Sequence, residues 1–414
     1  MDGLRLARTP VKATVREARE GVTYFTCFKC GQRFSCCNAA SRVQSLHMSE
    51  TPATPTQPAR PIIAVTMGDA AGVGPEVCLR LLNEQRWPEE SVPVVYGNAR
   101  ILERVAKAIN VPFQAKVLGS PSEPVAGPAV YDVPGVLIGQ DIAPGRNQAA
   151  CGHAAAKFIE AAVNACRSGY AAAMVTAPIS KRALNLAGIE FLGHTEMIAA
   201  LTGSDRYAML LYSEEKRLAV AFATSHQSLR SVPESLSGER IVQVATLLNH
   251  HLKLLHPDQT PRLAVLGLNP HAGEEGLFGS EEESIIEPAV ARIRQLGIDV
   301  TGPLPPDTAF TPAALQRFDG HVALYHDQGG IPFKMAAFDS GVNVTLGLEL
   351  IRTSPDHGTA YDIAWKGVAD THSFFAAYAL AARLAVAKGK AGVARKTSSR
   401  RLVAASRNGE QPKS

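Results

Sequence analysis

Residues 263–274 read LAVLGLNPHAGE, an apolar run that ends in a polar string around His271. Two further segments repeat this pattern: LAVAFATSH at residues 218–226 and VALYH at residues 322–326. Short apolar runs bounded by turn residues are consistent with buried strands. Each of the three segments therefore predicts a strand that ends close to a histidine.

Similar apolar runs alternate with helical stretches through most of the chain. This alternation predicts an α/β protein with a largely parallel sheet. The length of 414 residues is sufficient for two lobes. We expect strands at residues 61–66, 92–96, 172–176, 206–212, 218–223, 263–268, 321–325 and 342–346, and helices at residues 75–84, 152–167, 238–255 and 312–318.

The histidines that follow these strands are candidate metal ligands. Ligands of open α/β sheets bind at the carboxyl ends of strands, so His226, His271 and His326 could meet there. Three imidazoles can hold one divalent ion and leave positions open for a substrate, as in catalytic sites. A single histidine at a strand end is more often a hydrogen-bonding or surface residue. The spacing alone leaves both interpretations open.

Charge and composition favour an enzyme for small molecules. The whole chain carries +4, but residues 1–47 carry +5 and residues 388–414 carry +7, which leaves −8 for residues 48–387. A basic pI can indicate nucleic acid as a partner, but here the excess lies in the tails. No apolar run reaches the roughly 18 residues of a membrane span. The spacing of Cys78, Cys151 and Cys166 shows no disulfide framework, which fits a reducing, cytoplasmic location.

The two ends of the chain differ from its body. Residues 1–47 are rich in arginine but lack the apolar core of a secretory signal. We expect residues 1–60 to be a disordered leader, with Met48 as the true start, and residues 391–414 to be a disordered basic tail. Half of a zinc site is one interpretation of Cys27 and Cys30, but the adjacent Cys36 and Cys37 make a poor second half.

We predict that residues 1–47 are dispensable for folding and catalysis, because their composition is foreign to the body. A protein that begins at Met48 should stay in solution, keep its bound metal and keep its specific activity. Expression of residues 48–414 beside the full chain measures this directly. Loss of folding or of metal from the shorter protein would reject the prediction.

Several longer motifs carry a family resemblance. Together with the histidine strings, and in this order, they resemble the PdxA family of 4-hydroxythreonine-4-phosphate dehydrogenases over about residues 62–387. The resemblance implies two α/β/α lobes of the isocitrate/isopropylmalate dehydrogenase type within residues 61–390, with the active site in the cleft between the lobes. The motifs are TMGDAAGVGPE at 66–76, GHTE at 193–196, GPLPPDT at 302–308, GVNVTLGL at 341–348 and IRTSPDHGTA at 351–360.

The resemblance also implies roles for individual residues. The metal ligands fall on His226, His271 and His326, and the substrate contacts on His194, Thr195, Lys334, Asn343 and Arg352. The catalytic candidates are Lys334, His194, Asp307 and Asp327, and the cofactor loop supplies His357, Gly358, Thr359, Ala360 and Asp362. NAD, or alternatively NADP, and one divalent ion (Zn, Mg, Mn or Co) are the implied cofactors. A homodimer whose subunits share the metal site is the implied assembly.

Elementary chemistry agrees with some of these roles and leaves others open. Arg352 can grip a carboxylate or phosphate through two nitrogens. Lys334 lies in an apolar run and would be costly to bury without an anion, unless it is an exposed lysine of an edge strand. Asp307 and Asp327 can orient histidines or cap loops. Lys181 is a further candidate, although its place at a helix start explains it equally well.

The dinucleotide site has no G-x-G-x-x-G motif. Residues 356–364, DHGTAYDIA, resemble the loop that holds adenosine in β-decarboxylating dehydrogenases. The glycines of residues 68–74 can present backbone N–H groups to an anion, or can simply form a tight turn. Trp365 stands where the family usually has glycine, so an indole could stack on adenine or crowd the loop. Glu349 replaces a common proline and is expected to place a negative charge near Arg352.

The expected reaction is the oxidation of the 3-hydroxyl of 4-phosphohydroxy-L-threonine by NAD to a 3-keto acid, which then loses CO₂, in pyridoxal phosphate biosynthesis. The opening TMGD at residues 66–69 departs from the TPGE of some pyridoxine-pathway enzymes and looks more like branches that act on D-threonate or D-erythronate 4-phosphate. A third branch oxidises a cis-dihydrodiol dicarboxylate from aromatic degradation. A non-enzymatic metal-binding regulator with a cysteine-rich head is the remote alternative.

Overall fold

The computed structural model describes residues 24–26, 33–35, 60–137, 140–191 and 193–407, which belong to two compact units, Met1–Thr56 and Gln57–Ser414. In the first unit, strands β1 (Tyr24–Thr26) and β2 (Arg33–Ser35) pair antiparallel, within the segment that we expected to be a disordered leader. The four clustered cysteines, Cys27, Cys30, Cys36 and Cys37, lie outside the described residues, so the zinc interpretation stays a prediction.

One sheet of twelve strands forms the centre of the second unit. The strand order is β11-β10-β12-β9-β8-β13-β14-β7-β3-β4-β6-β5. Within the described residues, eight of the eleven neighbouring pairs are parallel, which agrees with the largely parallel sheet that we predicted. The strands are β3 Ile62–Thr66, β4 Val92–Gly97, β5 Lys116–Leu118, β6 Ala129–Asp132, β7 Ala173–Thr176, β8 Ala208–Ser213, β9 Leu218–Phe222, β10 Arg262–Leu266, β11 Asp299–Leu304, β12 Gly320–Ala323, β13 Val342–Leu346 and β14 Arg352–Pro355.

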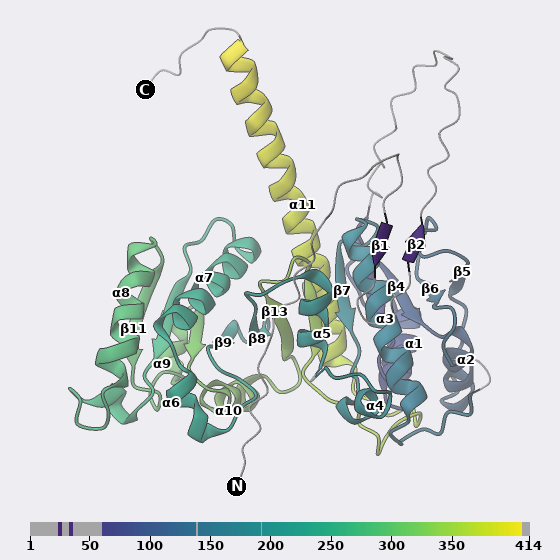
Figure 1. Cartoon of the computed structure of the whole chain (residues 1–414), viewed down its shortest axis with the longest axis horizontal. Helices are drawn as coiled ribbons and strands as arrows, with labels where there is room; N and C mark the ends of the chain where they lie inside the picture. Colours follow the sequence, from purple (N-terminus) through teal and green to yellow (C-terminus); the bar gives the residue numbers. More distant parts are fainter. Residues whose placement is uncertain (1–23, 27–32, 36–59, 138–139, 192, 408–414) are drawn as a thin grey trace. The chain divides into compact units, whose positions relative to one another are not determined.

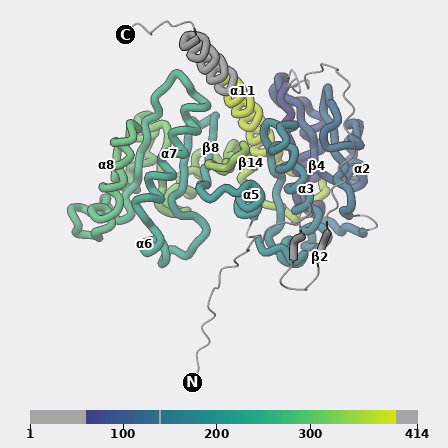
Figure 2. Tube along the Cα trace, turned by 45° about the horizontal axis from the view of Figure 1, so that its top comes forward, coloured from purple at the N-terminus to yellow at the C-terminus, as the bar shows by residue number. Residues whose placement is uncertain are grey.

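The three antiparallel pairs lie together in the middle of the sheet. β13 runs antiparallel to both β8 and β14, and β8 runs antiparallel to β9. These strands join two parallel halves, so the sheet serves both lobes. Figures 1 and 2 show β8 and the neighbouring β13 and β14 between the half with α7 and α8 and the half with α1, α2 and α3.

Helices connect the parallel strands, because a parallel pair needs a crossover. Strands covered on both faces become continuous apolar runs, and β3 and β9 are buried at every position. The helices are α1 Gly74–Glu84, α2 Ala99–Ala108, α3 Ala149–Arg167, α4 Lys181–Leu186, α5 His194–Thr202, α6 Val232–Ser235, α7 Gly238–Leu255, α8 Glu287–Gln295, α9 Pro312–Arg317, α10 His326–Ala337 and α11 His372–Arg407.

Helix α11 corrects the expectation for the carboxyl terminus. It runs to Arg407, so the disordered tail that we expected at residues 391–414 does not agree with the structure over residues 391–407. Extending a helix adds one hydrogen bond per ordered residue, whereas starting one is costly, and alanine, lysine and arginine favour the extension. Residues 408–414 lie outside the described part. Among the described helices, none has the length and apolar character that a membrane crossing requires.

Candidate active site

A cavity of about 330 Å³ lies against the middle strands. Because alternate residues of a strand share a face, Asn343 of β13 and both Arg352 and Ser354 of β14 reach the same side of the sheet. Both halves of the body contribute to the walls. The other lining residues include Thr176, Lys181, His194, Thr195, Glu196 and His357 from one half, and Tyr207, Met209, Ser225, His226 and Arg240 from the other.

Arg352 is the main positive charge at the base of this cavity. Its side chain is 3% exposed, and its three described hydrogen bonds all go to threonine hydroxyls. Nε and Nη2 donate to Thr176 Oγ1 at 3.2 and 2.7 Å, and Nη1 donates to Thr345 Oγ1 at 3.1 Å. Burial lowers the pKa of Arg352 to about 10, so it remains cationic at neutral pH. The charge of Glu196 opposes this fall, but no carboxylate is among the described hydrogen-bond partners of the guanidinium, and a buried cation of this kind favours an anionic ligand.

Two further predicted substrate contacts lie beside Arg352. Helix α5 begins with His194 and Thr195, and Thr195 Oγ1 is 3.4 Å from Thr345 Oγ1. Burial, and secondarily Arg352, lowers the pKa of His194 well below its usual value, so this imidazole is neutral. Its Nε2 is buried and has no hydrogen-bond partner within the described residues. The cavity therefore presents a cation beside a neutral imidazole.

The structure brings together two of the three predicted metal ligands. The ring centroids of His226 and His326 are 5.6 Å apart. His326 Nδ1 is 2.7 Å from Asp327 Oδ1, and His271 Nδ1 is 2.8 Å from Glu274 Oε2. Metal-binding histidines commonly give their second nitrogen to a carboxylate in this way. His326 and His271 thus have the chemistry of metal ligands, because Nδ1 of each contacts a carboxylate and Nε2 is left for the ion.

His271 does not complete the site within one chain. No group of three or more His, Cys, Asp or Glu side chains in the described residues is placed to hold a metal ion. The His271 side chain is 62% exposed, and its hydrogen bond to Glu274 raises its pKa. The chemistry of the three imidazoles fits a divalent ion, but one copy of the chain does not bring them together.

Lys334 lies on helix α10, so the alternative of an edge-strand lysine is wrong. Its Nζ is 3.4 Å from Asp356 Oδ2, and Asp356 is the residue before the expected cofactor loop. Asp356 lines both the cavity described above and a second one. Burial raises the pKa of Asp356, while Lys334 opposes this rise. Lys334 thus pairs with a wall residue that the two cavities share, but it is not itself among the residues that line either cavity.

The remaining catalytic candidates differ in their setting. Asp327 contacts His326, which supports its orienting role. Asp307 is exposed, and its charge contributes, after Glu274, to the raised pKa of His271, which favours a place beside that histidine. Lys181 opens α4 and lines the cavity beside Glu196. Sequence reasoning missed Glu196, Arg240, Asp356 and the two threonines that hold Arg352; the GHTE and IRTSPD motifs already contained Glu196 and Asp356.

The expected cofactor loop borders the second cavity, whose volume is about 170 Å³. His357 and Ala360 of this loop line it, whereas Asp362 is exposed. Other walls come from Val73, Phe338, Asp339, Asp356, Ile363, Ala369, Asp370 and Ser373. A small, largely apolar space that opens beside His357 suits one end of a dinucleotide.

The glycine-rich turn after β3 packs tightly against its surroundings. Ala71 N–H donates to Asp69 Oδ1, Gly72 N–H to Asp69 O and Val73 N–H to Thr359 O, so these three amides already have partners. A Cβ built on Gly68 would lie 2.4 Å from Pro178 O. These contacts favour the tight-turn interpretation over an anion cradle at residues 71–73.

Two departures from the family pattern now have a structural explanation. Glu349 pairs with Arg167, at 3.6 Å between Oε2 and Nε, so its charge has a partner of its own, and an effect on Arg352 stays a prediction. Trp365 has φ of 61°, a left-handed conformation in which glycine is common. Its Nε1 donates to Ala70 O at 3.1 Å, and the Arg104 guanidinium lies 5.1 Å from the ring centroid. Ala70 and Arg104 of the protein itself therefore hold the indole in place.

Comparison with known proteins identifies the family. The PdxA family, described as pyridoxal phosphate biosynthetic protein PdxA, matches residues 89–381. A 4-hydroxythreonine-4-phosphate dehydrogenase of Desulfosudis oleivorans is 45% identical over 80% of this chain and 98% of its own length. A D-threonate 4-phosphate dehydrogenase of Pectobacterium atrosepticum is 42% identical over 78% of this chain and 99% of its own.

A crystal structure extends the similarity to the fold. The 4-hydroxythreonine-4-phosphate dehydrogenase of Klebsiella pneumoniae superimposes with a TM-score of 0.69 at 42% identity, over 78% of this chain and 99% of that one. The mixed α/β fold is therefore confirmed, as is the resemblance that the motifs carried. The identities, the extent of the match and the shared fold show that this chain belongs to the PdxA family of dehydrogenases.

Proposed function

We propose that this protein oxidises the hydroxyl of a small phosphorylated hydroxy acid with NAD, in the presence of a divalent metal, and that the resulting 3-keto acid loses CO₂. The observation that carries the proposal is the buried cation Arg352, whose hydrogen bonds within the described part of the chain all go to threonine hydroxyls, and which lines a cavity that adjoins the expected cofactor loop. NADP is the alternative cofactor.

The residues that line the cavity have different proposed roles in binding the substrate and the cofactor. Arg352 binds a carboxylate or phosphate of the substrate, and Lys181 and Arg240 add positive charge to the walls. Neutral His194 accepts or donates a hydrogen bond at the hydroxy acid, and Asn343 orients it. Residues 357–362 would hold NAD, whose nicotinamide would supply the hydride acceptor. A metal ion held by His226, His326 and His271 would polarise the substrate oxygen.

A homodimer is part of the proposal, because one chain does not assemble the three histidines. Large apolar side chains are exposed close in sequence to each of them. Helix α10, which begins at His326, exposes Ile331 and Met335 at 58 and 84%, and Phe338, directly after the helix, is 70% exposed. Leu229 follows His226, and Leu277 and Phe278 follow His271, and they too are exposed. Such a surface is typical of an interface, and we propose that a second copy of this chain covers it.

The substrate branch is the finer part of the proposal. We favour 4-phosphohydroxy-L-threonine, which places the protein in cytoplasmic pyridoxal phosphate biosynthesis. D-threonate or D-erythronate 4-phosphate is the second candidate, supported by the TMGD opening and by the similarity to a D-threonate 4-phosphate dehydrogenase. A cis-dihydrodiol dicarboxylate is the third candidate.

A substrate panel tests this proposal. NADH formation is followed by absorbance with 4-phosphohydroxy-L-threonine, the two sugar-acid phosphates and a dihydrodiol dicarboxylate, each with NAD or NADP and with each of the four metals. We expect the highest kcat/KM with a phosphorylated substrate, and the highest of all with 4-phosphohydroxy-L-threonine. A preference for a sugar-acid phosphate would move the protein to the other branch. Absence of both NADH and NADPH with every substrate would reject the enzymatic proposal.

A further inference from the structure

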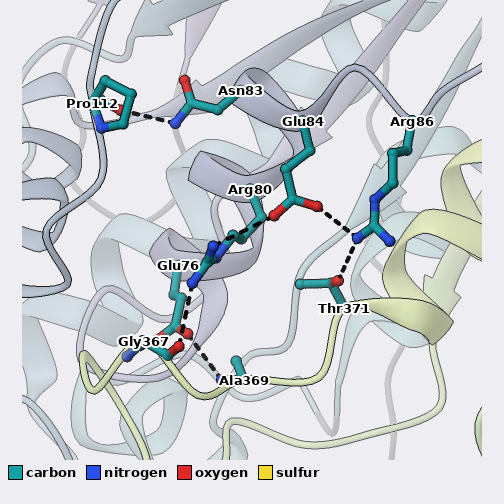
Figure 3. A network of polar contacts seen from close by, with 9 residues as sticks. All are labelled: Glu76, Arg80, Asn83, Glu84, Arg86, Pro112, Gly367, Ala369 and Thr371. Carbon is teal, nitrogen blue, oxygen red and sulfur yellow. Dashed lines mark hydrogen bonds and ion pairs between the residues drawn. The ribbon is translucent and has the colours of Figure 1, made fainter.

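Glu76 is a buried carboxylate with an unusual pair of partners. It lies in the first turn of α1 and is fully buried. Its two oxygens accept hydrogen bonds from backbone amides of a distant segment, from Ala369 N–H to Oε1 at 2.9 Å and from Gly367 N–H to Oε2 at 3.1 Å (Figure 3). One side chain thus ties helix α1 to the chain just after the expected cofactor loop.

Arginines of the same helix region hold this segment at further points. Arg80 Nη2 donates to Gly367 O at 3.2 Å, and Arg86 Nη2 donates to Thr371 Oγ1 at 3.1 Å. Glu84 joins the two arginines, at 2.6 Å from Arg86 and 3.5 Å from Arg80 (Figure 3). The side chains of Arg80, Glu84 and Arg86 are partly exposed, whereas the side chain of Glu76 is fully buried. Glu76 is therefore the strongest tie in the network.

The turn before α1 holds the cofactor loop itself. Val73 N–H donates to Thr359 O at 3.0 Å, and Tyr361 Oη donates to Asp69 Oδ2 at 2.8 Å. The whole stretch from Thr359 to Thr371 is thus fixed on one turn and one helix. Val73, Ala360, Ile363 and Ala369, which line the smaller cavity, all lie on the segments that these contacts join.

We propose that Glu76 is a positioning residue for the dinucleotide: it fixes residues 367–369 on α1 and so sets the wall of the cofactor cavity. This inference rests on the proposed NAD-dependent function. Loss of the carboxylate would leave two amides without their partners, and a shift of the segment would relieve them. The substrate-binding Arg352 should keep its position in such a variant, because Thr176 and Thr345 hold it separately.

Steady-state kinetics and direct NAD binding test the inference. Glu76→Ala removes both acceptors, and Glu76→Gln keeps one of them, which makes it the variant of choice if the alanine protein does not fold. We expect Glu76→Gln to raise the KM and the Kd for NAD about ten-fold, equivalent to about 1.4 kcal/mol, with an unchanged substrate KM and with kcat recovered at saturating NAD. Asn83→Ala is the matched control on α1, because Asn83 Nδ2 donates to Pro112 O instead (Figure 3).

The outcomes separate this inference from the function on which it rests. Unchanged NAD affinity in folded Glu76→Gln, or an equal rise of the NAD and substrate KM values, would overturn the positioning role while the wild-type activity stands. An equal effect of Asn83→Ala would overturn it as well, since any loosening of α1 would then suffice. A wild-type protein that neither binds nor reduces NAD would overturn both the role and the proposed function.

Discussion

Replacing His326 with alanine is expected to remove the bound metal and nearly all turnover while leaving the fold intact. Loss of a partner that orients a ligating histidine typically lowers metal affinity roughly 10- to 100-fold, and loss of the ligand itself should cost more. His326 is partly exposed at the start of α10, so its removal leaves the buried core unchanged. Metal content per chain, turnover and the melting temperature are the measurements.

The same result is expected for His226→Ala and His271→Ala, while His153→Ala is the control, because His153 is exposed on α3 away from the cavity. Wild-type metal content in His271→Ala would remove that residue from the site.

A site shared between subunits has a further consequence, which mixed dimers can test. In a mixed dimer of a His226→Ala chain and a His271→Ala chain, one site has both defects and the other has none. Activity should therefore return in mixed dimers, and its absence would contradict sharing between subunits.

Replacing Arg352 with lysine is expected to raise the substrate KM about ten- to a hundred-fold, although the charge is kept. The guanidinium donates through three nitrogens to Thr176 and Thr345, and a lysine ammonium cannot keep this planar arrangement. Loss of a charge-assisted contact to the substrate costs about 1.5–3 kcal/mol, which corresponds to that range. Initial rates against varied substrate and varied NAD measure both affinities in one experiment.

The control for this variant is Arg262→Lys, which alters another arginine with a fork-like pairing, to Asp319, outside the cavity. It should leave both KM values unchanged. An unchanged substrate KM and kcat in Arg352→Lys would show that Arg352 is structural. A matching loss of NAD affinity would show that it faces the cofactor.

Much of the fold could be predicted from apolar runs, because strands covered on both faces have few polar residues. Every expected strand has a counterpart in the structure, and the expected helices match α1, α3, α7 and α9. Helix α10 was missed: its sequence, HDQGGIPFKMAA, contains two glycines and a proline, which oppose a helix in isolation. Packing of Phe333 and Ala337 into the core outweighs that local preference.

The site was harder to predict than the fold. Strand β14, RTSP, is polar yet buried, so no apolar pattern marks it. The antiparallel direction of β8 and β13 depends on pairing between distant segments, and it places the cavity against the face of the middle strands in addition to the strand ends. For the same reason, the sequence could not show that Glu349 pairs with Arg167 or that Glu76 reaches Gly367 and Ala369.

The most direct test of the proposed function is the ratio of NADH formed to CO₂ released by the wild-type protein, with 4-phosphohydroxy-L-threonine, NAD and a divalent metal. The account predicts one CO₂ for each NADH and loss of both when the metal is removed by a chelator. NADH without CO₂, or formation of both at the full rate without metal, would contradict it.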